Sequence, residues 1–229
     1  MVFLIHLFAS QKNKGTVYMI KSVDQLVNKY LDAKDYIIDK GYSWEIDWQN
    51  NQDYEKITES DFIRESAWVI LSSGFKETIV RKIFPLISNC FLDWGSPRVI
   101  LNSLNNCRKN ALKVFKNTKK INAICEIITF VNSKDFSIVK KEIKLRGIDY
   151  LKQLPYIGPI TGLHLLKNLG LQLIKPDRHL IRIAKCAGYN SPKDLGDVIK
   201  EAIGDSLSEI DIVLWRYSTL NKDYIQFFS

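Results

Sequence analysis

One acidic residue stands out by its surroundings. Asp177 follows Pro176 and begins a segment, 178–187, that has helical character in a basic and apolar neighbourhood. A helix start and nearby cations both favour the ionised form of a carboxylate. Asp is also a common N-cap residue, so a purely structural role is the alternative. The two roles are compatible at one position.

A short turn lies upstream of this aspartate. The run from Leu154 to Gly162 reads L-P-Y-I-G-P-I-T-G and joins expected helices over 140–151 and 159–169. Gly158 permits backbone conformations and close approaches that other residues do not. The free N–H groups and positive dipole end of the following helix suit a phosphate. The alternative is an ordinary helical corner that binds no ligand.

Turn, spacing and aspartate together resemble the helix-hairpin-helix superfamily of DNA glycosylases with a Gly/Pro-rich loop and a catalytic Asp (HhH-GPD). The likeness rests on L-P-x-x-G, the helix after it and P-D-x-H-x-x-R, over about residues 140–188. A weaker likeness covers 61–94. There, A-W-V-I-L-S-S-G looks like the family's buried helix before the loop that probes the duplex.

The resemblance implies that Asp177 stabilises the oxocarbenium-like sugar as the base leaves and helps to orient or activate the attacking group. Bifunctional members carry a nucleophilic Lys two residues after the hairpin glycine. That position is Ile160 here, which cannot form a Schiff base. We therefore expect a monofunctional glycosylase that leaves an abasic site. Its substrate ranges from a damaged or mismatched base to a hypermodified phage base such as glucosylated hydroxymethylcytosine, so repair and phage defence both stay open.

Double-stranded DNA is the expected partner. The residues expected to contact DNA are Lys152, Tyr156, Gly158, Ile160, Thr161, Lys175 and Arg178. The resemblance also implies a monovalent cation, Na⁺ or K⁺, on the backbone carbonyls of Lys152, Leu154 and Ile157, although Tyr156 replaces the usual glycine. No cofactor is expected to be required. Cys186 is the last cysteine, so the iron–sulfur loop of some members is missing.

Flipping a base out of the duplex leaves a gap that a side chain usually fills. The loop after Gly74 offers Phe75 or Lys76 as this wedge, with a core role as the alternative for Phe75. The expected base pocket draws on the aromatic and acidic segment 42–57. Its candidates are Trp44, Glu45, Trp48 and Trp68, the last of which has plain packing as its alternative.

Charge is unevenly distributed along the 229 residues, which carry a net charge of +8. The span 24–61 has net −6, whereas 140–185 has net +7 and 108–120 holds six basic residues and no acidic one. Such an excess suits a polyanion, either nucleic acid or a membrane surface. No basic amphipathic helix with an exposed aromatic face favours the membrane. The apolar start, Val2 to Ala9, is expected to be a buried first segment rather than a signal peptide.

The chain is 46% hydrophobic, enough for a real core, and helix signals dominate it. We expect an all-α, two-lobed bundle of about ten helices with the active site in the cleft between lobes. The helices are expected over 22–40, 60–73, 76–90, 97–116, 121–131, 134–145, 159–169, 177–187, 192–203 and 206–220. Residues 60–175, with the hairpin in 140–170, would form one lobe, and 1–59 plus 176–229 the other.

The four cysteines are expected to be reduced thiols in a cytoplasmic, nucleoid-associated monomer. Two alternatives to a monofunctional glycosylase remain. One is a non-catalytic helix-hairpin-helix DNA-binding protein, which would not need Asp177. The other is a bifunctional glycosylase/lyase that uses a displaced lysine such as Lys152, Lys167 or Lys175.

Overall fold

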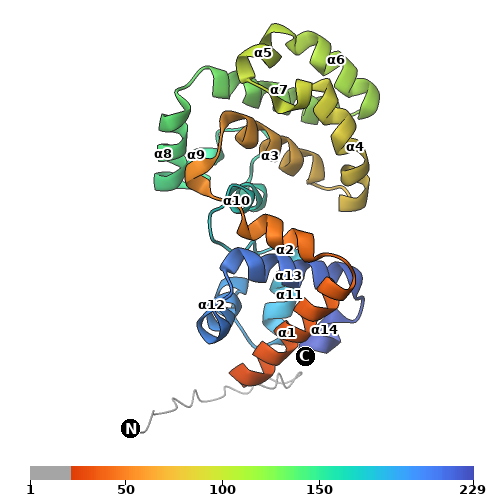
Figure 1. The fold of residues 1–229 in the computed structure, drawn as a ribbon, viewed down its shortest axis with the longest axis vertical. Coiled ribbons are helices and arrows are strands. Elements are labelled where there is room, and N and C mark those ends of the chain that lie inside the picture. Colours follow the sequence, from red (N-terminus) through yellow and green to blue (C-terminus); the bar gives the residue numbers. More distant parts are fainter. Residues whose placement is uncertain (1–21) are drawn as a thin grey trace, which may run out of the picture.

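The computed structural model describes residues 22–229, and every regular element in this range is a helix (Figure 1). The all-α prediction is therefore confirmed. The predicted buried segment at Val2–Ala9 lies outside the described residues. Within 22–229, no helix combines the length and apolar character needed to cross a bilayer.

The helices have the following bounds in chain order. The first half holds α1 (Val23–Asp39), α2 (Ser43–Asn50), α3 (Glu59–Ser72), α4 (Glu77–Cys90), α5 (Pro97–Asn102), α6 (Leu104–Val114) and α7 (Thr118–Asn132). The second half holds α8 (Phe136–Arg146), α9 (Ile148–Leu151), α10 (Pro159–Asn168), α11 (Arg178–Cys186), α12 (Pro192–Ile203), α13 (Leu207–Leu220) and α14 (Tyr224–Phe228). Two short 3₁₀ turns, η1 (Tyr54–Lys56) and η2 (Leu92–Trp94), complete the described part.

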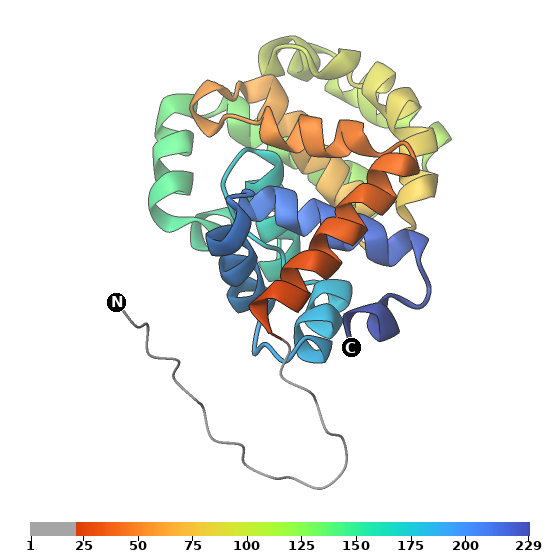
Figure 2. The same ribbon diagram turned by 60° about the horizontal axis from the view of Figure 1, so that its bottom comes forward.

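Buried apolar side chains form two separate clusters. One joins η1 and α3–α10, and the other joins α1 and α2 to α11–α14. Figure 1 shows the first group above and the second below, with α10 and α2 where they meet. Figure 2 shows α1 lying across the C-terminal helices. Tyr54 packs in the first cluster and Ile174 in the second, so each cluster draws on residues beyond the predicted boundaries at 59/60 and 175/176.

Side-chain caps fix several helix starts. Ser22 accepts the Gln25 amide at the start of α1 (3.2 Å), and Ser191 accepts the Asp194 amide before α12 (3.1 Å). Such caps satisfy amides that have no partner within the helix. The predicted boundaries of these helices agree closely with the structure because capping is a local signal.

The helices differ from the expected set in three ways. Residues 42–57 contain a helix, α2, whose buried residues are Glu45, Ile46 and Gln49. Two of these are polar, so a search for apolar periodicity misses the helix. The expected helix over 97–116 is broken at Ser103 into α5 and α6. The described residues hold fourteen α-helices rather than about ten, because the short α2, α9 and α14 add to this split.

The link between α10 and α11 makes a sharp, close-packed turn at Gly170. This glycine has φ +95°, and a Cβ added to it would lie 2.8 Å from the backbone nitrogen of Tyr54. Only glycine combines this conformation with so close an approach. The turn sends residues 171–176 from the first cluster into the second, where Asp177 caps α11.

Candidate active site

Asp177 is the N-cap of α11. Its Oδ1 atom accepts hydrogen bonds from the amides of His179 (2.9 Å) and Leu180 (3.1 Å). Its Oδ2 atom lies 3.5 Å from Nζ of Lys175. One carboxylate oxygen is thus committed to the helix, and the other carries charge that faces a cation. The structural and chemical roles that the sequence allowed are both compatible with this geometry.

Asp211, fully buried on α13, fixes the segment that leads to Asp177. Its Oδ1 accepts the backbone amide of Lys175 (2.7 Å), and its Oδ2 accepts Nζ of Lys167 (2.6 Å). Burial lowers the pKa of Lys167, and the carboxylate of Asp211 opposes that shift. Lys167 is therefore held in an internal ion pair, as is typical of a buried lysine.

Asp177 lies in the wall of a cavity of about 930 Å³, to which helices of both hydrophobic clusters contribute. The structure brings most of the predicted site residues into this wall. They are Trp44, Glu45, Trp48, Trp68, Phe75, Lys76, Ile160, Thr161, Lys175, Asp177 and Arg178. Lys152, Tyr156 and Gly158 lie outside the wall, on the turn before α10.

The turn before α10 differs from the expectation for Gly158. Gly158 is extended (φ −100°, ψ −171°), and an added Cβ would meet only Thr161 Oγ1, at an ordinary 3.9 Å. The left-handed residue is instead Tyr156, with φ +64°. The conformational freedom assigned to Gly158 is thus needed two residues earlier, at the position where the glycosylases usually have glycine.

Few amides at the start of α10 are open to a phosphate. The Gly158 N–H donates to Thr161 Oγ1 (2.7 Å), and Pro159 has no N–H. The amides of Ile160 and Thr161 are the next in the first turn, where helix amides have no intrahelical partner. Lys152 pairs with Asp149 (2.9 Å) on the exposed surface.

The carbonyls predicted to hold a cation also lie in this turn. The carbonyl of Leu154 accepts the Ile157 amide (3.2 Å), whereas those of Lys152 and Ile157 accept no hydrogen bond within the described residues. Neutral carbonyl oxygens are suitable ligands for a monovalent cation, so the donor set fits the group that the resemblance implies. The cation remains a prediction.

The predicted wedge loop follows α3. Phe75 is 40% exposed and packs edge-on against Phe115, with 5.2 Å between ring centroids. Nζ of Lys120 donates to the carbonyls of Ile70 (2.6 Å), Leu71 (3.0 Å) and Ser73, and burial lowers the pKa of Lys120 to about 8. This lysine caps the C-terminal end of α3 and anchors the loop.

The predicted base-pocket aromatics line the cavity from two helices. Trp44 and Trp48 lie four residues apart on α2 and are both exposed. Residues at this spacing share one helix face. Trp68 on α3 is only partly buried and packs edge-on against Phe84, with 5.1 Å between ring centroids. Trp68 therefore both packs against the core and lines the cavity, the two alternatives that the sequence allowed for it.

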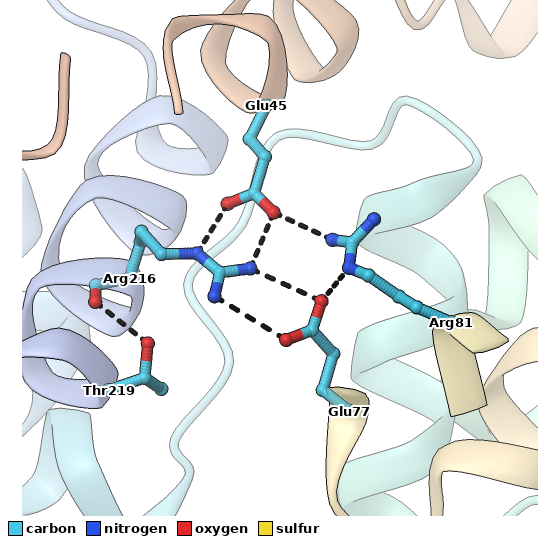
Figure 3. Close-up of polar contacts among 5 residues, drawn as sticks. All are labelled: Glu45, Glu77, Arg81, Arg216 and Thr219. Carbon is cyan, nitrogen blue, oxygen red and sulfur yellow. Dashed lines mark hydrogen bonds and ion pairs between the residues drawn. The ribbon is translucent and has the colours of Figure 1, made fainter. Parts of the chain in front are cut away.

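Glu45, predicted to read the base, instead belongs to a ring of four charged side chains (Figure 3). Arg216 forms a two-pronged pair with it, through Nε (2.7 Å) and Nη2 (2.5 Å), and Arg81 Nη2 donates to it at 2.6 Å. Glu77 closes the ring by accepting from Arg81 Nε and from Arg216 Nη2 (3.2 Å). The Glu45 carboxylate is thus occupied by protein cations.

The sequence reasoning missed Glu77, Arg81 and Arg216. The ring joins α2 and α13 to α4 and so connects the two hydrophobic clusters beside the cavity. The Arg216 guanidinium also lies over Tyr42 and Trp215, at 4.3 and 4.7 Å from their ring centroids. Glu77 and Arg81 are an i,i+4 pair that a helix brings together, but no local pattern links them to Glu45 or Arg216, which are themselves 171 residues apart.

Two further titratable groups line the cavity. Burial raises the pKa of Glu65, which hydrogen-bonds Asn168 (3.0 Å) and pairs with Arg64. Desolvation and the nearby cations Lys175 and Lys167 hold the pKa of His164 well below its usual value, so this imidazole is neutral at pH 7. Among residues 22–229, no group of three or more His, Cys, Asp or Glu side chains is placed to hold a metal ion.

The site thus consists of a short helix (α9), a turn and a second helix (α10), followed by an aspartate that caps α11 beside the cavity. Among solved structures, the chain is similar to Methanocaldococcus jannaschii 8-oxoguanine glycosylase/lyase, determined in complex with a 15mer DNA containing 8-oxoguanine. The TM-score is 0.62 and the sequence identity 20%, over 86% of this chain and 98% of that chain. The predicted resemblance is thereby confirmed at the level of the fold. No family model and no curated protein matches.

Proposed function

We propose that this protein is a monofunctional DNA glycosylase. It flips a modified or mismatched base out of double-stranded DNA, hydrolyses the N-glycosidic bond and leaves an abasic site. The observation that carries the proposal is Asp177, whose carboxylate is fixed by two backbone amides in the wall of a large, aromatic-lined cavity. The shared fold with a DNA-bound glycosylase/lyase supports it.

The proposed chemistry centres on the Oδ2 atom of Asp177. As the bond between C1′ and the base breaks, positive charge develops on the sugar, and a fixed carboxylate in a water-poor site stabilises it. Water then adds to C1′ and loses a proton to Asp177 or to solvent. The capping bonds from His179 and Leu180 hold the carboxylate in place before the substrate arrives.

The monofunctional assignment rests on the amines near Asp177. Ile160, at the position of the family's nucleophilic lysine, is 46% exposed and lines the cavity. Lys167 is held by Asp211, and Lys175 faces Asp177 itself. The alternative that a displaced lysine acts as nucleophile has Lys175 as its best candidate, because its Nζ is 3.5 Å from the carboxylate.

The proposal leaves open which base is excised and whether the role is repair or phage defence. It further predicts a monomeric, cytoplasmic, nucleoid-associated protein. The cavity volume of about 930 Å³ is compatible with a bulky modified base. The open choice of substrate therefore calls for a broad panel of modified duplexes.

The proposal is tested by assaying wild type and Asp177→Asn for abasic sites on duplexes with damaged, mismatched and hypermodified bases. Abasic product from the wild type, and little or none from the variant, is the expected result. DNA binding without product from either protein, on every duplex, would favour the non-catalytic helix-hairpin-helix binder instead.

Borohydride trapping tests the monofunctional claim separately. We expect no covalent complex between the wild type and abasic DNA, since no lysine occupies the motif position. Ile160→Lys restores an amine there and serves as the matched variant in which trapping is expected. Trapping of the wild type that disappears in Lys175→Gln would establish the displaced-lysine alternative.

A further inference from the structure

Arg81 occupies an unusual place in the cavity wall. Its side chain is 40% exposed, whereas its ring partners Glu45 and Arg216 are almost fully buried. Glu45 and Glu77 hold its Nη2 and Nε atoms, and its guanidinium carbon lies 4.7 Å from the ring centroid of Trp44. A guanidinium held by two carboxylates and an aromatic face keeps a fixed orientation.

One edge of this guanidinium remains free. Figure 3 shows the third nitrogen of Arg81, Nη1, directed away from the ring of charges, and it has no partner among the described residues. Arg216 differs, because Glu45 and Glu77 together engage all three of its nitrogens. Arg81 therefore offers both N–H groups of Nη1 to a molecule in the cavity without leaving the ring, whereas Arg216 is almost fully buried and has only one N–H of Nη1 left.

The charge of the wall points to the kind of base that fits. The lining includes seven basic side chains and four acidic ones, and two of the basic ones, Lys167 and Arg64, also pair with Asp211 and Asp61 outside the lining, which leaves a small positive excess. The basic residues are Arg64, Lys76, Arg81, Lys167, Lys175, Arg178 and Arg216, and the acidic ones are Glu45, Glu65, Glu77 and Asp177. A cationic base, such as an alkylated purine, enters this excess of positive charge at a cost.

The aromatic lining is also partly occupied by the protein's own cations. Arg81 lies over Trp44 and, at 5.6 Å, over Trp68, while Lys175 lies 5.7 Å from the ring centroid of Trp215. A cation is attracted to an aromatic face because the face is electron-rich. Where a protein cation already lies over that face, an incoming cationic base gains less from stacking there.

We propose that Arg81 reads the flipped base, and that the site takes neutral bases that present oxygen acceptors rather than cationic alkylated purines. Oxidised purines and pyrimidines that carry hydroxymethyl or sugar groups belong to this class. The inference rests on the glycosylase function proposed above. It names a specificity-determining residue that donates through Nη1 to an oxygen of the base.

The chemistry of the leaving group supports the same choice. When the glycosidic bond breaks, its electron pair stays with the base, so a neutral base leaves as an anion and then takes a proton from solvent. A cationic alkylated purine leaves as a neutral molecule. The positive charge of Arg81 stabilises the developing charge only in the first case, and such differential stabilisation lowers the barrier.

The experiment compares single-turnover base release from duplexes that contain 8-oxoguanine, glucosylated 5-hydroxymethylcytosine or 7-methylguanine, corrected for spontaneous loss. We expect wild type to release at least one neutral base about 100-fold faster than 7-methylguanine. Arg81→Met should slow release of the neutral base by most of that factor and slow 7-methylguanine release far less. Lys82→Met, an exposed neighbour on α4, is the matched control and should behave as the wild type.

A preference of the wild type for 7-methylguanine, or an equal loss on all duplexes in Arg81→Met, would overturn the inference. Arg81→Lys keeps the charge without the fork and should retain part of the preference, which separates base reading from a folding defect. Affinity for 2′-fluorinated duplexes, whose glycosidic bonds resist cleavage, reads recognition without catalysis. If the affinities for these duplexes differ between bases and depend on Arg81, but no base is released from any cleavable duplex, only the glycosylase function is contradicted. Equal affinities for all the duplexes would overturn the inference.

Discussion

Two parts of one cavity wall are built in different ways. Around Asp177 the contacts are local, because the caps and the facing cation come from residues within three positions of it. The second part is the ring of Glu45, Glu77, Arg81 and Arg216, which joins three helices. Glu77 and Arg81 are neighbours on α4, but the other paired residues are 36 to 171 positions apart in the sequence. The first arrangement fixes one carboxylate, and the second fixes the two hydrophobic clusters relative to each other.

This difference separates chemistry from assembly. The Asp177 carboxylate is capped by its own helix, and only the segment before it is anchored by a distant residue, Asp211, so loss of the carboxylate should affect base release far more than folding. The ring is largely buried, and removal of one partner leaves another charge uncompensated. Its loss should affect folding first.

Breaking the ring should give the largest change in stability. Glu45→Gln leaves the buried Arg216 with Glu77 as its only carboxylate partner, at a longer distance, so we expect the free energy of unfolding to fall by about 3 kcal/mol. Denaturant unfolding measures this. Asp197→Asn, which breaks the exposed Lys193–Asp197 pair, is the control and should change stability by less than about 0.5 kcal/mol. Similar small effects of both variants would mean that the ring does not join the clusters.

Titration of His164 should make stability depend on pH. Its folded-state pKa lies below the ordinary 6.5, so in acid the unfolded chain binds a proton that the folded chain does not. Stability should fall as pH drops through about 6.5, by up to about 1.4 kcal/mol for each further pH unit.

The measurement is the difference between wild type and His164→Gln across pH 5 to 7.5. Glu65, whose pKa is raised by burial, contributes in the opposite direction and cancels in this difference. Parallel curves for the two proteins would show that His164 is protonated equally in the folded and unfolded states.

Much of the hairpin side of the site is predictable from sequence, and the ring side is not. A helix cap depends only on residues close in the sequence, so the caps at Asp177, Ser22 and Ser191 can be predicted locally. The helix α2 escaped prediction because its buried face is mostly polar, and Glu45 makes sense only beside Arg216. Long-range pairing of charges leaves no periodic mark in one sequence.

The turn before α10 shows a subtler limit. L-P-x-x-G marks a tight turn, but it does not say which residue has positive φ. In the structure that residue is Tyr156, while Gly158 is extended. Pro159 and Thr161 restrict which amides stay free, and this depends on side-chain geometry rather than on the motif.

The cap at Asp177 should have a moderate effect on stability. Asp177→Ala loses both capping bonds, and we expect the free energy of unfolding to fall by about 1 kcal/mol. Asn caps about as well as Asp, so Asp177→Asn should stay within a few tenths of a kcal/mol of the wild type. Thermal unfolding of the two variants side by side checks this, and equal losses would mean that charge rather than capping stabilises the helix start.

The smallest effect should come from Lys152, an exposed lysine on the hairpin. Lys152→Gln should lower the slope of log affinity against log salt for duplex DNA by about 1, since one phosphate contact is lost. Lys193→Gln is the control, because Lys193 is also exposed and ion-paired but lies on α12, outside the cavity wall. Equal slopes for both variants would place the DNA on another face.

The most direct test of the central claim is the single-turnover rate of base release by Asp177→Asn on the best substrate of the panel. The variant keeps the cap and removes the charge, so we predict a fall in rate on the order of 10³-fold. Affinity for uncleavable duplex DNA and the free energy of unfolding should stay close to the wild type. A variant that releases the base at the wild-type rate would show that Asp177 is only a helix cap.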